Sequence, residues 1–376
     1  MPKIPMVDLV GQYHTIKPEI DKAIEEVMET GTFIKGPAVK QFQANLEHYL
    51  GAKHVIPCGN GTDALQISMM ALGLQPGDEV ITPSFTFIAT AEVIALLGLK
   101  PVFVDVDPDT FTLDMDEVKN KITPNTKAII PVHLFGQCAD MNSILELAEK
   151  HNLSIIEDAC QAIGAEYKLK DGSVRQAGTI GDLGAMSFFP SKNLGTFGDG
   201  GAIFTNNDKL AEKCRSISNH GMKRRYYHDD IGVNSRLDSI QAAILDVKLK
   251  HLDTYIANRQ KAAEYYNHAV KKISQFQTPA VIEDSTHVYH QYTLVTKDID
   301  RDKLREHLAE QGIASAVYYP VPIHLQNAYQ HLGYREGDLP VTEELSKRVI
   351  SLPIHTELTK DIQDEIIGAV KEFVGK

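Results

Sequence analysis

The fold is decided by the stretch Gly184-Ala-Met-Ser-Phe-Phe-Pro-Ser-Lys-Asn-Leu-Gly-Thr-Phe-Gly-Asp-Gly-Gly-Ala-Ile-Phe-Thr-Asn206. Its two short apolar runs, 185–189 and 202–205, are predicted to be buried strands because turn residues bound them. The loop between them carries several glycines, which let a backbone approach a ligand closely, and one lysine, Lys192. Aromatic residues and a proline flank Lys192, so we expect partial desolvation that lowers its pKa. A neutral amine of this kind can form a Schiff base, whereas an isolated lysine in a loop is more often simply solvated.

Upstream of this stretch, short apolar segments alternate with segments of helical periodicity. Two helices are predicted first, at 16–31 and 37–50, and the alternation then continues to about residue 240. The predicted strands are 55–57, 79–82, 101–106, 128–132 and 153–157, and the predicted helices between them are 63–72, 88–97, 115–122 and 144–151. This order predicts right-handed βαβ units, and hence an α/β fold with a mostly parallel sheet covered on both faces.

The pattern changes after residue 236. A single long helix is predicted over 236–273, where apolar residues follow one stripe. It is followed by predicted strands at 288–295 and 314–318 and predicted helices at 301–310 and 362–373. These segments indicate a smaller α+β domain. We therefore predict two domains, a large one at 1–250, which includes the N-terminal helices, and a small C-terminal one at 251–376.

Composition excludes several classes of function. The 376 residues carry a formal net charge of −12 without a long basic tract, which argues against nucleic acid as a partner. No apolar run approaches the ~20 residues of a membrane span, and no leader segment is recognisable. The four cysteines show neither metal-ligand nor disulfide spacing, so we expect reduced thiols and no metal site. These features predict a cytoplasmic protein that does not bind membranes.

A possible phosphate-binding site lies at the turn between the first predicted strand and the helix that follows it. In open α/β sheets, ligands bind beyond the carboxyl ends of the strands. The turn Asn60-Gly61-Thr62-Asp63 stands at such an end, where a helix N-terminus offers free N–H groups and a favourable dipole to a phosphate. Thr62 or Asp63 could instead be an ordinary N-cap.

Three further residues fall near the ends of strands. Asp158 ends an apolar strand and needs a partner, for which a protonated heteroaromatic nitrogen, an arginine or a backbone cap would serve. Phe87 could stack on a flat ring or lie in the core. Ser187 could donate to a phosphate or bond the local backbone. With Lys192, this set contains the groups that a pyridoxal 5'-phosphate (PLP) site needs: a phosphate cradle, an aromatic plate, an acid for the ring nitrogen and an amine for the aldehyde.

Six motifs connect these residues to a known family. They are Gly59-Asn-Gly-Thr-Asp-Ala-Leu65, Gly77-Asp-Glu-Val-Ile-Thr-Pro83, Pro131-Val-His-Leu-Phe-Gly136, Glu157-Asp-Ala-Cys-Gln161, Ser187-Phe-Phe-Pro-Ser-Lys192 and Gly232-Val-Asn-Ser-Arg-Leu-Asp-Ser-Ile-Gln-Ala-Ala243. In this order and spacing, over essentially the whole chain, the sequence resembles the DegT-like family of nucleotide-sugar aminotransferases. The resemblance implies a PLP enzyme of fold type I with a mostly parallel seven-stranded sheet, and a homodimer with active sites shared across the interface.

The resemblance also implies roles for individual residues. Lys192 would bind PLP as a Schiff base and move the proton at the substrate carbon, and Asp158 would pair with the pyridine nitrogen. Phe87 would stack on the ring, and Gln161 would contact its hydroxyl side. The residues implied for the phosphate are Gly61, Thr62, Asp63 and Ser187 from one subunit and Asn234 from its neighbour.

The family relation further implies a reaction. L-glutamate would load its amino group onto the cofactor, and a keto-sugar nucleotide would take it. Relatives with histidine at the position of Lys192 are sugar 3-dehydratases, so the lysine favours an aminotransferase. Residues 225–228 and 233–238 are similar to the branch that aminates C3 of UDP-2-acetamido-2-deoxy-3-oxo-glucuronate or dTDP-3-oxo-6-deoxyhexoses. We predict the UDP-linked uronate, in surface-polysaccharide or O-antigen sugar biosynthesis, with the dTDP sugar or C4 amination of a 4-keto-6-deoxysugar as alternatives.

Six residues are candidates for the sugar nucleotide: Arg225, His228, Arg236, Tyr318, Tyr319 and His324. The fork of Arg236 suits a uronate carboxylate or a diphosphate. At Tyr318 the family commonly has histidine, and His324 is more similar to the deoxyhexose enzymes.

Two rival classes are less consistent with the residues. A nicotinamide-dependent oxidoreductase needs a third glycine where Ala64 stands. A non-catalytic regulatory protein of the same fold should have lost Lys192 or Asp158.

Overall fold

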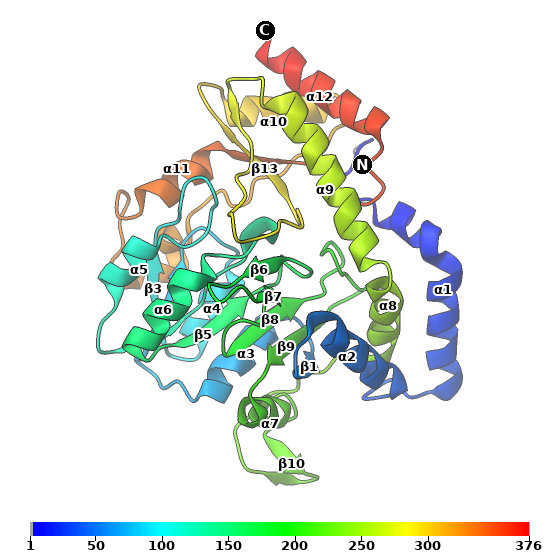
Figure 1. The fold of residues 1–376 in the computed structure, drawn as a ribbon, viewed down its shortest axis with the longest axis vertical. Coiled ribbons are helices and arrows are strands. Elements are labelled where there is room, and N and C mark those ends of the chain that lie inside the picture. The colour runs from blue at the N-terminus through cyan, green and yellow to red at the C-terminus, as the bar shows by residue number, and fades with distance from the viewer. Residues whose placement is uncertain (1–2, 376) are drawn as a thin grey trace.

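A seven-stranded sheet forms the centre of the protein in a computed structural model that describes residues 3–375 (Figure 1). Its strands are β1 (His54–Cys58), β2 (Glu79–Pro83), β3 (Lys100–Val104), β4 (Thr126–Ile129), β5 (Ser154–Asp158), β8 (Leu183–Ser187) and β9 (Gly201–Thr205). They are ordered β1-β9-β8-β5-β4-β2-β3, and only β9 runs antiparallel to its neighbours. The prediction of a mostly parallel α/β sheet is confirmed.

Helices cover both faces of this sheet. They are α2 (Pro37–Leu50), α3 (Gly61–Leu72), α4 (Ala89–Leu96), α5 (Met115–Lys121), α6 (Met141–His151), α7 (Asp208–Ile217) and α8 (Ser239–Leu249). Outside them, α1 (Leu9–Thr30) packs against α8. The helix α1 begins seven residues before the predicted helix at 16, because Asp8 accepts a hydrogen bond from the Gly11 N–H at 2.8 Å and caps it.

Alternation along the strands explains why both faces are buried. Val55 and Ile155 belong to one apolar cluster, whereas their neighbours Ile56 and Ile156 belong to another on the opposite face. Side chains point to opposite faces with a period of two, so continuous apolar strands need helices on both sides. Each such buried side chain contributes about 1.5–3 kcal/mol.

A second set of elements follows α8. It comprises α9 (Leu252–Val270), β12 (Phe276–Gln277), β13 (Tyr292–Thr296), α10 (Arg301–Glu310), α11 (Pro340–Arg348), β14 (Val349–Leu352) and α12 (Lys360–Val374). The strands form an antiparallel sheet, β12-β13-β14, with an apolar cluster that includes Tyr266 and Val270 of α9. The predicted domain boundary at 250/251 falls just before this set and stays a prediction.

Two predicted elements of this region are wrong. The long helix over 236–273 is broken between Leu249 and Leu252, because α8 packs against α1 and α2 while α9 crosses to the C-terminal cluster (Figure 1). Within residues 3–375, the predicted strand 314–318 makes only one bridge, between Ala316 and Ser351. Pro320 and Pro322 follow it and lack the N–H that a continuing ladder needs.

Two small hairpins lie outside the two larger sheets. They are formed by β6 (Glu166–Lys168) with β7 (Val174–Gln176), and by β10 (Met222–Arg224) with β11 (Tyr227–His228). The second projects beyond α7 at the lower end of Figure 1. Among the helices of residues 3–375, none combines the length and the apolar character that crossing a membrane requires.

Candidate active site

The loop that carries Lys192 is folded back tightly on the end of β8. The Lys192 N–H donates to the Phe189 carbonyl, and the Thr196 N–H donates to the Phe188 carbonyl, both at 2.8 Å. At Gly195 a Cβ would lie 2.3 Å from the Pro190 carbonyl oxygen, so only glycine fits this turn. The Lys192 side chain is partly buried, and this burial lowers its pKa, although Cys160 and Asp158 oppose the shift. The amine is therefore more available in its neutral, nucleophilic form.

Asp158 lies at the end of β5 and is 7% exposed. One oxygen accepts from the Thr90 hydroxyl at 2.7 Å, and the other accepts from the Cys160 N–H at 3.2 Å. Within residues 3–375 no lysine, arginine or histidine forms an ion pair with it. Three partners were possible from the sequence. In the described residues a backbone N–H, that of Cys160, is present and an arginine is not. Without a basic partner, the carboxylate remains able to pair with a protonated ring nitrogen.

Thr90 also contributes to this site, although it was not predicted from the sequence. It lies in the first turns of α4, is 1% exposed, and orients Asp158 through its hydroxyl. The available signal was a polar residue within the apolar run 88–97, three residues after Phe87. That signal is weak, because a buried threonine often bonds its own backbone.

The neighbouring carboxylate, Glu157, is structural. It accepts from His133 Nε2 at 2.8 Å and from three backbone N–H groups, those of Gly178, Ile180 and Gly181. His133 Nδ1 accepts from the Ala139 N–H, so Nε2 carries the proton that is donated to Glu157. The His133 N–H also donates to the Asp158 carbonyl at 3.0 Å. This network fixes the end of β5 and hence the position of Asp158.

The N-terminus of α3 forms a cradle beside β8. A Cβ on Gly61 would lie 2.8 Å from both Ser187 Cβ and Cys160 Sγ, so glycine allows this close approach. Within residues 3–375, the N–H groups of Gly61 and Thr62 find no acceptor. The Ser187 hydroxyl oxygen accepts from the Phe189 N–H at 3.3 Å, and its own proton is free to be donated. These donors suit a phosphate at a helix N-terminus.

Asp63 differs from its predicted role as a phosphate ligand. Its N–H donates to the N-cap Asn60 at 2.8 Å, and its carboxylate accepts from the Ser235 hydroxyl at 2.6 Å. Ser235 in turn accepts from the Gly59 N–H at 2.9 Å. A carboxylate has no proton for a phosphate and repels it, so Asp63 supports the cradle through Ser235, and the N-cap is Asn60 rather than Thr62 or Asp63.

An aromatic group lies near these residues. Phe87 is 54% exposed, as a ring-stacking residue should be, and its ring centroid is 6.2 Å from that of Tyr319. Gln161 accepts from the Phe135 N–H at 2.8 Å and donates to the Tyr319 hydroxyl at 3.2 Å. The Tyr318 ring lies 5.8 Å from that of Tyr319. The structure therefore brings two substrate candidates from the C-terminal region to predicted cofactor residues.

Four other predicted residues lie on or beside the hairpin β10–β11 in the described chain. Arg225 is exposed and lies 5.0 Å from the Tyr226 ring, and His228 Nδ1 is 2.8 Å from the His220 carbonyl. Asn234 is exposed and Arg236 is partly buried on the segment that returns to α8. Their roles toward the substrate and the cofactor stay predictions.

His324 does not fit its predicted role as a substrate contact. It is 1% exposed, its Nδ1 lies 2.7 Å from the Ser84 hydroxyl, and its Nε2 lies 3.1 Å from a Glu343 oxygen. Both ring nitrogens are therefore occupied, and burial lowers the pKa of the imidazole. Ser84 follows β2 directly, so His324 connects the C-terminal region to the segment that carries Phe87.

We expect His324→Ala to lower the free energy of unfolding by roughly 2–4 kcal/mol, because it removes one buried hydrogen bond each from Glu343 and Ser84 and leaves a cavity at a buried position. KM for the sugar nucleotide should change less than about twofold. Urea unfolding and steady-state kinetics measure the two effects, with His331→Ala as an exposed histidine control. A large rise in KM at unchanged stability would instead restore His324 as a substrate contact.

This chain is similar to known proteins over nearly its whole length. The chain is 50% identical over 372 residues, 98% of each chain, to a protein of Geobacillus stearothermophilus named "Pleiotropic regulatory protein". It is 47% identical over 355 residues to the UDP-2-acetamido-2-deoxy-3-oxo-D-glucuronate aminotransferase of Pseudomonas aeruginosa, covering 94% of this chain and 96% of the relative.

Solved structures of aminotransferases are also similar to this chain. The crystal structure of S. venezuelae DesV in complex with ketimine intermediate superposes with a TM-score of 0.95 at 40% identity, covering 100% of both chains. NtdA from Bacillus subtilis with bound cofactor PMP gives a TM-score of 0.89 at 33% identity, covering 100% of this chain and 86% of that one.

The family model for DegT/DnrJ/EryC1/StrS aminotransferases matches residues 14–371. The Gly61 cradle, the partly buried lysine and a carboxylate free of basic partners fit PLP, which is the cofactor of this family. The predicted resemblance, fold type and cofactor are thus confirmed. The chain belongs to the DegT/DnrJ/EryC1/StrS aminotransferase family and is a PLP-dependent sugar aminotransferase.

Proposed function

We propose that this aminotransferase moves the amino group of L-glutamate to C3 of UDP-2-acetamido-2-deoxy-3-oxo-glucuronate, for surface-polysaccharide sugars. The observation that carries the choice of sugar is the 47% identity, over 94% of this chain, to the Pseudomonas aeruginosa enzyme named for that substrate. A second relative, 43% identical, is named for UDP-N-acetyl-3-dehydro-α-D-glucosamine, which also has its keto group at C3 of a UDP sugar.

The residues of the site support amino transfer. Bound PLP would act as an electron sink for the bond that breaks at the substrate carbon. Lys192, with its lowered pKa, would take a proton from that carbon and return it in the second half-reaction. Asp158, held by Thr90, would keep the ring nitrogen protonated, and the exposed Phe87 would hold the ring in place.

A carboxylate distinguishes the uronate from the deoxyhexose alternatives. Arg236 is the residue that we assign to it, since a guanidinium can bind a carboxylate with two hydrogen bonds. The dTDP-sugar alternative rests on a relative of Streptomyces venezuelae, 40% identical and named dTDP-3-amino-3,4,6-trideoxy-α-D-glucose transaminase. The alternative of C4 amination rests on a relative of Caulobacter vibrioides that is 39% identical to this chain and is named GDP-perosamine synthase. A regulatory role is less consistent, because Lys192 and Asp158 are both retained.

We further propose a homodimer with shared active sites. The hairpin β10–β11 and the segment after it project from the body and expose apolar side chains, with Tyr226 76% and Ile231 87% exposed. Exposed apolar groups of this kind favour a protein partner. Asn234 follows them and would enter the neighbouring subunit's phosphate cradle.

We expect Asn234→Ala to weaken PLP binding about tenfold, the effect of about one lost charge-assisted hydrogen bond, while the dimer persists. Dialysis followed by visible absorbance measures retention, and analytical ultracentrifugation measures the dimer. Asn125→Ala, at an exposed position, is the control. Unchanged retention would argue against a phosphate contact from the partner.

The proposed function is tested by the visible spectrum of the PLP-loaded protein before and after L-glutamate. Conversion of the visible band to the shorter-wavelength amine form would establish the first half-reaction. The amine form is then mixed with each keto sugar: the UDP-3-keto uronate, a dTDP-3-keto-6-deoxyhexose and a 4-keto-6-deoxysugar nucleotide. Return of the visible band with the uronate at the highest kcat/KM supports the proposal, and preference for another sugar contradicts it.

A further inference from the structure

Lys248, in α8, is a buried cation beside the Lys192 loop, which we define as residues 192–201. Its side chain is 1% exposed, and within residues 3–375 it forms no ion pair with a carboxylate. Its Nζ donates to the Gly195 carbonyl at 2.7 Å and lies 4.8 Å from the centroid of the Phe197 ring. Both contacts therefore fall on the Lys192 loop.

A buried lysine without a counter-ion lowers the stability of the folded protein. Burying an ammonium group without a counter-ion carries a large desolvation penalty, and here burial lowers the pKa of Lys248 to about 8. The adjacent Leu245 and Leu249 are apolar core residues, and a methionine would fill the same space without the penalty. A residue that breaks a local rule of this kind beside an active-site loop indicates a functional requirement.

Gln241 provides a second contact from the same helix. Its carboxamide oxygen accepts from the Thr196 hydroxyl at 2.6 Å. Gln241 and Lys248 are seven residues apart and therefore lie on one face of α8, two turns from each other. On the other side, the loop is anchored by the Asn193 amide, which donates to the Val288 carbonyl at 3.0 Å. The segment 193–196 is thus held between α8 and the C-terminal region.

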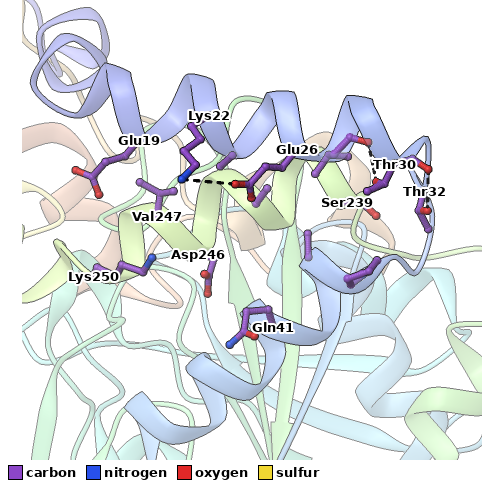
Figure 2. A pocket seen from close by; sticks show the side chains of 15 residues that line it. Glu19, Lys22, Glu26, Thr30, Thr32, Gln41, Ser239, Asp246, Val247 and Lys250 are labelled. Carbon is purple, nitrogen blue, oxygen red and sulfur yellow. Dashed lines mark hydrogen bonds and ion pairs between the residues drawn. The ribbon is translucent and has the colours of Figure 1, made fainter.

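The opposite face of α8 is separate from this loop. There Ser239, Val247 and Lys250 line a cleft of about 520 Å³ with α1 and α2, as Figure 2 shows. At 3.6 residues per turn, Ser239 and Lys250 lie about half a turn away from Gln241 and Lys248, and Val247 lies about a third of a turn away. None of the predicted cofactor residues lines the cleft. Lys250, the C-cap residue that directly follows α8, is exposed in this cleft, so it provides a nearby lysine without contact to the Lys192 loop.

We propose that Lys248 is a positioning residue that holds the Lys192 loop where the Lys192 amine reaches the cofactor aldehyde. The proposal rests on the assigned role of Lys192. The ammonium of Lys248 fixes the Gly195 carbonyl three residues after Lys192. Without it, this buried carbonyl loses its partner and the loop gains alternative conformations. Misplacement of a reacting group by about 1 Å costs on the order of 10²-fold in rate.

The test uses the full chain, freed of cofactor, and mixes it with PLP. The rate at which the visible band appears reports how well Lys192 is placed, independently of the sugar. Lys248→Met should slow attachment about tenfold or more. The melting temperature of the cofactor-free protein should change little, because removal of the desolvation penalty of the charge offsets the hydrogen bond that the Gly195 carbonyl loses. Lys250→Met should behave as the wild type.

A second variant tests the other contact between α8 and the loop, and peptide mapping identifies the lysine to which PLP is attached. Thr196→Val removes the Gln241 contact from the loop side and should slow attachment about threefold. Borohydride trapping and peptide mapping then identify the modified lysine. Attachment at Lys192 with a wild-type rate in Lys248→Met, or equal slowing in Lys250→Met, would overturn the proposal. Attachment of the wild type at another lysine would instead overturn the role of Lys192.

Discussion

Replacing Lys192 with alanine is expected to abolish the visible PLP band and to lower turnover by at least about 10⁴-fold. The loss is large because one amine would serve both as the covalent anchor of the cofactor and as the base at the substrate carbon. Within residues 3–375, the Lys192 side chain makes no hydrogen bond or ion pair, and the loop is held through backbone groups instead. The fold should therefore survive the substitution.

The result is measured by absorbance after PLP is added and by the rate of amino transfer from L-glutamate. Thermal unfolding of the cofactor-free protein should match the wild type within about 0.5 kcal/mol. Lys209→Ala, at an exposed position in α7, controls for the loss of a positive charge. Retained turnover would remove Lys192 from the centre of the site and undermine the proposed mechanism.

The sequence predicts elements well where local signals decide them. The helices 37–50 and 301–310 have the same bounds in the structure as in the prediction. The first has proline in its first turn and Gly51 after its end, and the second is capped by Asp300. The strand end at Asp158 also follows from a short apolar run, whereas the strand of Ser187 was predicted at 185–189 and lies two residues earlier, at Leu183–Ser187. These features need no information from distant parts of the chain.

The rest depends on contacts between distant residues. Thr90 and Asp158 are 68 positions apart, Asp63 and Ser235 172 apart, and Gly195 and Lys248 53 apart. No periodicity reports such pairs, and a polar residue in an apolar pattern gives only a weak signal. The burial of His324 could not be predicted for the same reason, since its partners Ser84 and Glu343 lie on other segments of the chain. The helix breaks after Leu249 because α8 packs against α1 and α2, whereas α9 packs in the C-terminal apolar cluster. A single apolar stripe in the sequence does not show that the two halves pack against different clusters.

Asp158→Asn is expected to retain PLP but to lower turnover by about 10²–10³-fold. The amide has nearly the same shape, and its oxygen can still accept from the Cys160 N–H, while its NH₂ group can donate to the Thr90 hydroxyl. Packing at the end of β5 should therefore be kept. The amide lacks the negative charge that stabilises a protonated ring nitrogen. Removal of a proton from the substrate carbon depends on that protonated nitrogen.

The measurement separates charge from position by comparing Asp158→Asn with Thr90→Val. The second variant keeps the carboxylate but removes the hydroxyl that orients it, so we expect a smaller loss, about tenfold, from one buried hydrogen bond. Single-turnover rates with L-glutamate, at saturating PLP, exclude effects of cofactor affinity. Equal losses in the two variants would mean that orientation, rather than charge, is the contribution of Asp158. A wild-type rate in Asp158→Asn would show that the site does not need a protonated ring nitrogen, because no other carboxylate identified at this end of β5 is free to replace it: Glu157 is committed to His133 and three backbone N–H groups.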